Sequence, residues 1–171
     1  LGEAAGIAIG DSSAGIYLAF GIVTALLERE ETGEGQWVST SLLQALIAML
    51  DFQAARWLVA HDVPQQVGND HPLYMPTSAF KTADGYINIA GSGNLYPRLC
   101  KVIGMPELMT HPDFSNFKLR HKNRDALVAL IEEKTSKRTS AAWVEELNKA
   151  GVPCGPIYKM NEVFADPQVT H

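Results

Sequence analysis

The sequence predicts an α/β chain in which a helical half is followed by a smaller α+β unit. Apolar residues recur at helical spacing over residues 14–31, and residues 41–60 are mostly apolar. Further along the chain, Asp84-Gly85 lies between alternating apolar residues, which is typical of a β-hairpin. Because residues 61–76 are rich in proline and polar residues, we expect a linker there, between segments 1–60 and 77–171.

Composition and charge narrow the functional classes. The 171 residues carry 46% hydrophobic and 19% charged residues, which is typical of a globular protein. The formal net charge of −5 argues against a nucleic-acid partner, because such domains are normally basic. No uninterrupted run reaches the ~18 apolar residues of a membrane span, so we also expect no membrane partner.

The two cysteines and the chain ends indicate a compartment and a context. Cys100 and Cys154 lie far apart and in no metal-type pair, so we expect free buried thiols in a reducing compartment. This favours a cytoplasmic location, or a mitochondrial one if the source is a eukaryote. The first ten residues are typical of the middle of a domain, so we expect a piece of a longer protein.

In the first half, Gly10-Asp11-Ser12-Ser13 predicts a turn and a helix start. A helix follows over residues 14–31, with small residues on a second face, and glycines from Gly33 onward end it. A short strand is predicted at 36–39 and a second long helix at 41–60.

In the second half, residues 80–81 and 86–89 form the predicted hairpin. Helices are expected at 96–103, 120–134 and 141–150. Gly104 should end the first of these helices and Gly151 the third. Thr139 and Ser140 supply the cap of the last of these helices. Residues 152–157 are extended, and 161–165 form a final helical turn. We expect the hairpin to pack against the helices at 120–134 and 141–150.

Asp11 is the acidic residue with the most interesting surroundings. One interpretation is a helix N-cap, which spacing alone favours. The other is a nucleophile, because a helix N-terminus stabilises an ionised carboxylate and small neighbours leave room for a substrate. The residues by themselves leave both interpretations open.

The remaining candidates are weaker. The five histidines show no metal-ligand spacing, so we expect no metal site. His71 stands out among them, because it lies in a polar loop between the two halves. The glycine turn at residues 91–94 is a poor phosphate cradle, since it lacks a following Lys-Ser/Thr.

Six stretches, taken together and in order, resemble the family III CoA-transferases of the CaiB/BaiF type, which include formyl-CoA transferase. The resemblance covers nearly the whole chain. The stretches are Gly10-Asp11-Ser12-Ser13-Ala14-Gly15, Leu26-Leu27-Glu28-Arg29 with Thr32-Gly33-Glu34-Gly35-Gln36, Gly68-Asn69-Asp70-His71-Pro72, Phe80-Lys81-Thr82-Ala83-Asp84-Gly85-Tyr86-Ile87, Gly151-Val152-Pro153-Cys154-Gly155-Pro156-Ile157 and Val163-Phe164-Ala165-Asp166-Pro167-Gln168-Val169.

The resemblance implies a fold, a reaction and a partner. Residues 1–60 would be the end of a large Rossmann-like domain with long linker helices, and 77–171 a small domain. Coenzyme A would pass from an acyl-CoA to a carboxylic acid through a covalent intermediate on Asp11, with the CoA thioester as substrate and no other cofactor. The whole enzyme would be an interlocked homodimer, and this piece alone would be inactive. The substrate-binding candidates are Gly10, Ser12, Gly68, Asn69, His71, Gly91, Gly93 and Asn94.

Two departures from the family pattern bear on specificity. Gly68-Asn69 leads straight into Asp70-His71-Pro72 without the glycine run of formyl-CoA transferases, which puts an oxalate/formate specificity in doubt. The α-methylacyl-CoA racemases share the fold but need an acid/base glutamate near the position of Asn94, where an amide cannot shuttle a proton. A racemase and a non-catalytic dimerisation domain remain the alternatives.

Overall fold

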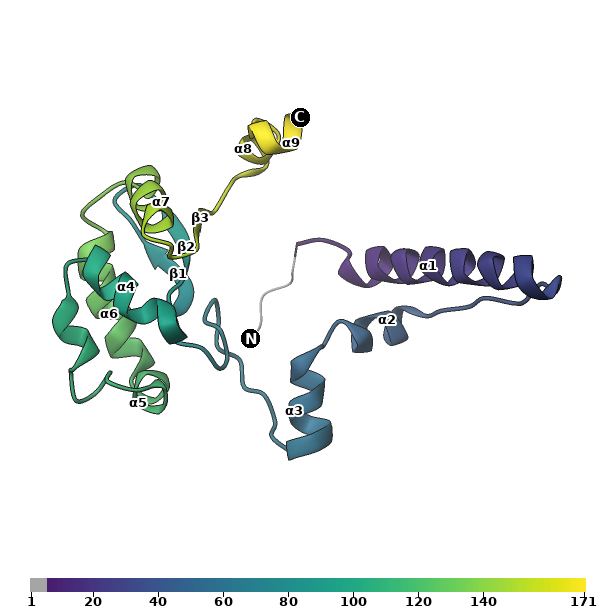
Figure 1. The fold of residues 1–171 in the computed structure, drawn as a ribbon, viewed down its shortest axis with the longest axis horizontal. Helices are drawn as coiled ribbons and strands as arrows, with labels where there is room; N and C mark the ends of the chain where they lie inside the picture. Colours follow the sequence, from purple (N-terminus) through teal and green to yellow (C-terminus); the bar gives the residue numbers. More distant parts are fainter. Residues whose placement is uncertain (1–5) are drawn as a thin grey trace. The chain divides into compact units, whose positions relative to one another are not determined.

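The computed structural model describes residues 6–171. The chain divides into two compact units, Leu1–Gln66 and Val67–His171 (Figure 1). The first unit is helical and the second combines helices with one three-stranded antiparallel sheet. This mixture confirms the predicted fold class.

Helix α1, Ile9–Thr32, begins five residues earlier than expected, because Gly10-Asp11-Ser12-Ser13 is already helical and Ala8 is the N-cap. It ends as predicted at Gly33, whose φ of 74° is left-handed and suits glycine. By length and composition alone α1 could cross a membrane. A buried helix of a water-soluble protein passes the same test, so the finding is weak evidence for a span.

Small residues let α1 approach its neighbours closely. A Cβ atom added at Gly10 would lie 3.4 Å from a Leu46 side-chain carbon, and one at Gly21 would lie 2.9 Å from Val38. Val38 belongs to the chain between α1 and α2, which forms no strand. The strand predicted at 36–39 was therefore wrong: no other segment among residues 6–171 pairs with it.

The single helix predicted at 41–60 was also wrong. The structure has two helices, α2 (Leu42–Ala48) and α3 (Phe52–Ala60), bent by 81° relative to each other. Ser41 caps α2 by accepting the N–H of Gln44 at 3.2 Å. The break occurs at Asp51, whose φ of 48° is outside the right-handed helical region.

The second unit is built on the predicted hairpin. Strands β1 (Thr77–Lys81) and β2 (Tyr86–Ala90) are antiparallel, with Phe80 opposite Ile87. A third strand, β3 (Cys154–Pro156), pairs with β2 and gives the order β1-β2-β3. Residues 154–156 of the extended segment predicted at 152–157 are thus part of the sheet.

Two of the predicted helices of this unit are confirmed and one is divided. The helix predicted at 96–103 ends before Gly104 (φ 70°), and the one at 141–150 is capped by Thr139 and ends before Gly151 (φ 72°). The helix predicted at 120–134 is two helices, because the chain breaks at Asn123. The helical elements are η1 (Gly93–Leu95), α4 (Tyr96–Val102), η2 (Pro106–Met109), α5 (Phe117–Lys122), α6 (Arg124–Thr135), α7 (Ser140–Lys149), α8 (Met160–Val163) and α9 (Pro167–Thr170).

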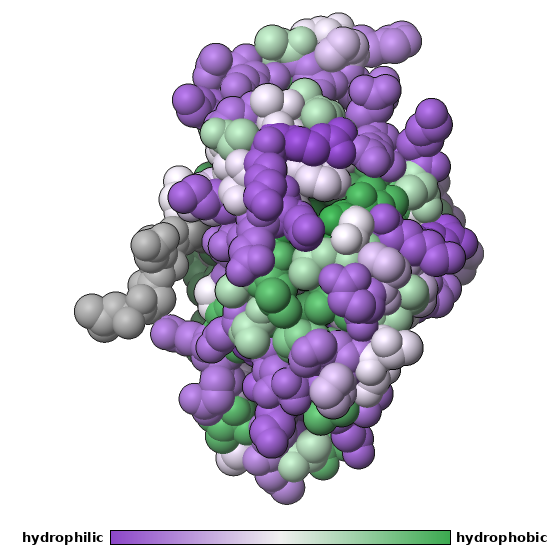
Figure 2. Space-filling view, turned by 90° about the vertical axis from the view of Figure 1, so that its left-hand side faces the viewer, coloured by the Kyte–Doolittle hydropathy of each residue, from purple (hydrophilic) through white to green (hydrophobic). Residues whose placement is uncertain are grey.

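The core of the second unit lies between the sheet and the helices α4, α6 and α7, so the predicted packing of the hairpin is confirmed. Polar side chains dominate the outer face shown in Figure 2, with smaller hydrophobic areas between them. The core side chains include Phe80, Ile87, Ile89, Leu99, Leu127, Ile131, Trp143, Leu147 and Val152.

Side chains from the helices bond the backbone of one residue in each outer strand of the sheet. At the β1 edge, the Lys81 N–H donates to Glu132 Oε1 at 2.8 Å and the Thr135 hydroxyl donates to the Lys81 carbonyl at 2.6 Å. At the β3 edge, the Asn148 amide bonds both backbone groups of Cys154, at 3.2 and 2.9 Å. These bonds fix α6 and α7 against the strands.

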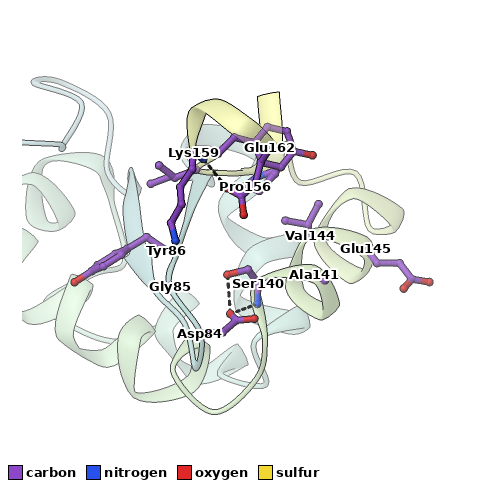
Figure 3. A pocket seen from close by; sticks show the side chains of 12 residues that line it. Asp84, Gly85, Tyr86, Ser140, Ala141, Val144, Glu145, Pro156, Lys159 and Glu162 are labelled. Carbon is purple, nitrogen blue, oxygen red and sulfur yellow. Dashed lines mark hydrogen bonds between the residues drawn. The ribbon is translucent and has the colours of Figure 1, made fainter. Parts of the chain in front are cut away.

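The hairpin turn is fastened to the start of α7 by Asp84 (Figure 3). One Asp84 carboxylate oxygen accepts the Ser140 N–H at 2.7 Å, the Ser140 hydroxyl at 2.9 Å and the Thr82 hydroxyl at 3.1 Å. These hydrogen bonds, the Ser140 backbone bond above all, lower the pKa of Asp84 because they favour its ionised form.

We expect Gly91→Ala to destabilise the second unit. The added Cβ would lie 2.4 Å from Leu99 Cδ2, and Leu99 is fully buried and has no room to withdraw. Overpacking of this kind costs about 1–3 kcal/mol in the free energy of unfolding, measurable by urea denaturation. The control is Gly155→Ala, where nothing lies within 4 Å of the added atom. Equal stability of the two variants would contradict the packing role of Gly91.

We expect Asp84→Ala to lower the urea midpoint at pH 7, because the Ser140 N–H and two hydroxyls lose their acceptor. The pKa of Asp84 is lowered on folding, so its charge stabilises the fold above the unfolded-state pKa of about 4 and that contribution is lost at lower pH. The difference in urea midpoint between Asp84→Ala and wild type should therefore decrease as the pH is lowered from 7 to 3. Glu133→Ala, an exposed change on α6, is the control; a gap independent of pH would refute this account.

Candidate functional site

Asp11 lies in the first turn of α1, where it is exposed to solvent. Because Ala8 is the N-cap, the interpretation of Asp11 as the cap is wrong. Within residues 6–171, no hydrogen bond or ion pair engages its carboxylate. A carboxylate that serves neither as a cap nor as an ion-pair partner is available for chemistry.

The surroundings of Asp11 suit an anionic nucleophile. The first-turn N–H groups of a helix have no partner inside the helix, and a 24-residue helix places partial positive charge at this end. Ser12 is exposed, and a Cβ added at Gly15 would meet nothing within 4 Å. Ser13 is turned inward, since its hydroxyl donates to the Ile9 carbonyl at 2.6 Å. The carboxylate thus stands among small residues.

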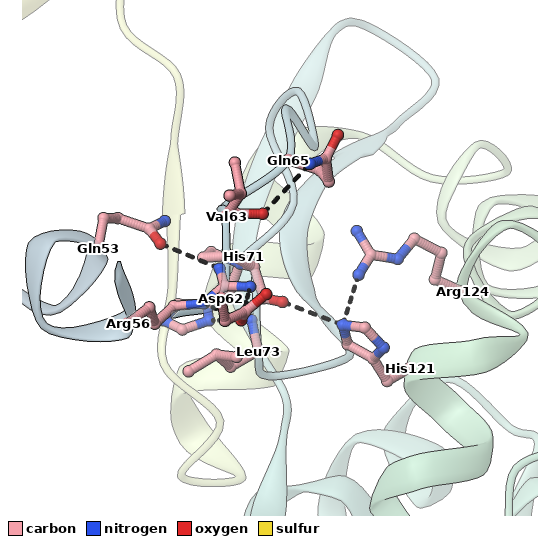
Figure 4. Close-up of polar contacts among 10 residues, drawn as sticks. Gln53, Arg56, Asp62, Val63, Gln65, His71, Leu73, His121 and Arg124 are labelled. Carbon is pink, nitrogen blue, oxygen red and sulfur yellow. Dashed lines mark hydrogen bonds and ion pairs between the residues drawn. The ribbon is translucent and has the colours of Figure 1, made fainter. Parts of the chain in front are cut away.

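The loop that begins the second unit holds three further candidates, Gly68, Asn69 and His71. His71 is labelled in Figure 4. Gly68 and Asn69 are exposed, and Gly68 has a left-handed φ of 63°. The ring of His71 shapes the loop, because its Nδ1 accepts the N–H groups of Leu73 and Tyr74 at 3.1 and 3.0 Å. Accepting at Nδ1 leaves the ring hydrogen of the neutral tautomer on Nε2.

The glycine turn after β2 contains the last three candidates. Gly91 is buried in the core, and its N–H donates to the Pro76 carbonyl at 2.8 Å. Gly93 and Asn94 are exposed in the short η1. Pro76 ends the loop that starts at Gly68, so the Gly91 bond ties these two candidate stretches together. Gly10, Asp11 and Ser12 belong to the other unit.

Sequence reasoning missed four polar residues around that loop. Three of them come from α5 and α6. Arg120 and His121 contact loop carbonyls, and Arg124 contacts His121. Arg124 reaches Asp70, which lies inside the loop. Their spacing is that of the charged face of an amphipathic surface helix, so the neighbouring sequence does not single them out as functional residues. A contact between residues about 50 positions apart cannot be recognised in a single sequence.

A cavity of about 800 Å³ between the hairpin turn and the segment leading into α8 was also not predicted. Tyr86, Tyr158 and Lys159 line it together with the acidic Glu145 and Glu162 (Figure 3). Among residues 6–171 no three His, Cys, Asp or Glu side chains gather as a metal site would require.

The two cysteines are not bonded to each other. Burial raises the pKa of the Cys100 thiol, and it raises the pKa of Cys154 to about 11. Because the thiolate is the nucleophilic form, neither residue is suited to nucleophilic catalysis at neutral pH.

Comparisons with known proteins agree on one family. The family model described as CoA-transferase family III matches residues 2–171. Succinyl-CoA:glutarate CoA-transferase of Homo sapiens is 34% identical over 97% of this chain and 38% of its own length. Acetyl-CoA:oxalate CoA-transferase of Acetobacter aceti is 35% identical over 95% of this chain and 42% of its own.

Solved structures agree with this result. The crystal structure of a CaiB/BaiF family protein from Brucella suis superposes with a TM-score of 0.81 at 35% identity, covering 98% of this chain and 45% of that one. The chain spans about two fifths of the length of the two curated relatives described above.

Proposed function

The chain belongs to CoA-transferase family III, and we propose that it carries the nucleophile for transfer of coenzyme A between an acyl-CoA thioester and a carboxylic acid. The observation that carries the proposal is Asp11, an exposed carboxylate without an ion-pair or hydrogen-bond partner among the described residues, at the N-terminus of a long helix. The CoA thioester is the substrate, and no further cofactor is invoked.

The proposed reaction balances without a net proton transfer. An Asp11 carboxylate oxygen attacks the thioester carbonyl carbon, the C–S bond breaks, and a mixed anhydride and CoA thiolate result. The thiolate attacks the Asp11 carbonyl carbon of the anhydride, which releases the donor carboxylate and leaves an aspartyl-CoA thioester. An acceptor carboxylate then attacks this thioester and expels the thiolate. Attack of the thiolate on the acceptor carbonyl forms the new acyl-CoA and frees Asp11.

The neighbouring residues have supporting roles in this proposal. Each tetrahedral intermediate develops an oxyanion, which the backbone N–H groups of Gly10 and Asp11 would stabilise. The N–H groups of Ile9 and Ser12 already donate to the carbonyls of Ile7 and Ala8. Gly68, Asn69 and His71 would contact the substrate from the loop. Gly93 and Asn94 would do so from the exposed glycine turn, whereas buried Gly91 would act through the shape of that turn.

The family relatives suggest which substrates to examine. One is named for succinyl-CoA and glutarate, another for acetyl-CoA and oxalate, so we propose short-chain acyl-CoA donors and small carboxylic acids. A racemase is less well supported, because the exposed amide of Asn94 cannot exchange a proton as the required acid/base pair must.

The exposed apolar side chains of the first unit support an assembly. Phe20, Leu43 and Val59 are 73%, 68% and 82% exposed, although such side chains are normally buried. We propose that in the whole enzyme these faces are covered by the rest of the fold and by a second copy in an interlocked homodimer, in the cytoplasm or a mitochondrion. A purely structural dimerisation role would leave the same faces but would not require Asp11.

We expect Asp11→Asn to lower transfer by several orders of magnitude in the whole enzyme, because the amide is a poor nucleophile. Loss of the charge at the helix start should cost less than about 1 kcal/mol of stability. Wild-type enzyme incubated with succinyl-CoA or acetyl-CoA and then hydroxylamine should yield a hydroxamate on the Asp11 peptide, seen by mass spectrometry.

Glu31→Gln, at the other end of α1, is the matched control and should retain both activity and labelling. Near wild-type transfer by Asp11→Asn, or a hydroxamate on another residue, would refute the assignment of the nucleophile.

We also expect this chain by itself to bind CoA weakly or not at all. CoA is polyanionic, and the unit that holds Asp11 contains only Arg29 and Arg56 as arginine or lysine, with Arg56 paired to Asp62 at 2.6 Å. Isothermal titration with CoA should therefore show no micromolar binding to the 171-residue chain. Micromolar affinity would mean that the CoA contacts lie within these residues.

A further inference from the structure

The loop from Gly68 to Pro76 has no regular secondary structure, yet it is held from one side by helices α5 and α6 (Figure 4). Within the loop, His71 Nδ1 accepts the N–H groups of Leu73 and Tyr74. At its two sides, the Asp70 N–H donates to the Val67 carbonyl at 3.2 Å and the His71 N–H donates to the Thr77 carbonyl at 2.8 Å. These bonds involve the backbone and the His71 ring, and the Asp70 carboxylate is left to contacts with the helices.

Arg124 connects the loop to α5. One of its terminal nitrogens lies 3.8 Å from the Asp70 carboxylate, and the other lies 2.8 Å from His121 Nε2. The side chains of Arg124 and Asp70 are 17% and 18% exposed, so solvent screens this ion pair less than a surface pair. The forked guanidinium can make both contacts at once, which a lysine cannot.

His121 is the second contact with the loop. Its Nε2 lies 3.0 Å from the Pro72 carbonyl as well as 2.8 Å from Arg124. Arginine only donates, so the bond to Arg124 needs Nε2 without a hydrogen, whereas the Pro72 carbonyl accepts only from Nε2–H. His121 Nε2 can therefore hydrogen-bond either Arg124 or the Pro72 carbonyl, but not both at once. The Asp70–Arg124 ion pair needs neither form of the ring in particular.

Arg120 fixes the far end of the same loop more firmly. It is buried, donates to the carbonyls of Met75 and Phe114 at 3.3 and 2.9 Å, and stacks 4.3 Å from the centre of the Tyr96 ring. The Met75 end is thus part of the core, and the end at Asp70 is held by partly exposed groups. The loop can be perturbed at that end without disturbing the core.

We propose that Asp70, His121 and Arg124 are positioning residues that hold the loop bearing Gly68, Asn69 and His71 in the conformation that binds substrate. The inference rests on the proposed function, since it assigns the loop to the substrate site. Binding costs less when the contacting loop is already ordered. The three residues would act through the loop and would not touch the reacting atoms.

The test compares Arg124→Gln with Arg124→Lys in the whole enzyme, using succinyl-CoA and glutarate or the fastest pair from a panel of acyl-CoAs and carboxylic acids. We expect Arg124→Gln to raise KM about 10-fold with little change in kcat, because the lost ion pair to Asp70 orders the loop for binding and takes no part in the chemical step. Arg124→Lys should recover part of this, because it keeps the charge opposite Asp70. Asp70→Asn should raise KM by a similar factor. The double variant Asp70→Asn with Arg124→Gln should have a KM no higher than that of either single variant.

Hydrogen exchange on the 171-residue chain gives a readout independent of activity. In Arg124→Gln the amides of residues 68–74 should exchange faster, with those of β1 and β2 unchanged. Lys122→Gln, an exposed change on α5, is the matched control. Unchanged exchange and KM in Arg124→Gln, or the same rise in Lys122→Gln, would overturn the inference. If wild-type enzyme gives no Asp11 hydroxamate, the proposed function fails instead.

Discussion

The small sheet of the second unit is fastened to its covering helices by side-chain bonds to the backbone of its two outer strands. A three-stranded sheet has two outer strands whose backbone groups lack a neighbouring strand, and such groups are costly when buried. Here Glu132 and Thr135 of α6 bond the backbone of β1, and Asn148 of α7 bonds that of β3. Because these bonds fix both helices, they also fix the apolar layer between helices and strands.

The two units differ in how many of their apolar side chains they bury. The second unit buries aromatic and aliphatic side chains such as Phe80, Trp143 and Leu147. In the described part of the first unit, the buried apolar residues are Ala14 and Ala45, and larger ones face outward. Burial of alanine contributes little hydrophobic free energy, so the described part of the first unit gains little stability from its own apolar packing. Asp11 lies on the first unit, which buries fewer large apolar side chains.

Features set by neighbouring residues could be predicted from the sequence. The hairpin follows from Asp84-Gly85, and α7 follows from the Thr139 cap and the Gly151 stop. The breaks at Asp51 and Asn123 could not be predicted, because neither residue is Gly or Pro and the flanking sequence remains compatible with a helix. Strand β3 is three residues long, and its partner β2 lies more than 60 residues earlier. The same division holds for the candidate site. Asp11 could be singled out from its small neighbours in sequence, whereas the Asp70–Arg124 pair and the Leu99 side chain facing Gly91 depend on tertiary structure.

The shielding of the two thiols has a consequence for a protein of this family. A thiolate exchanges readily with thioesters, so a reactive cysteine would draw acyl groups onto the protein itself. Burial raises the pKa of Cys154 to about 11, so its thiolate is a minor form at pH 7. Cys100 is fully buried and its pKa is also raised. Neither thiol is therefore disposed to take an acyl group from a thioester at neutral pH.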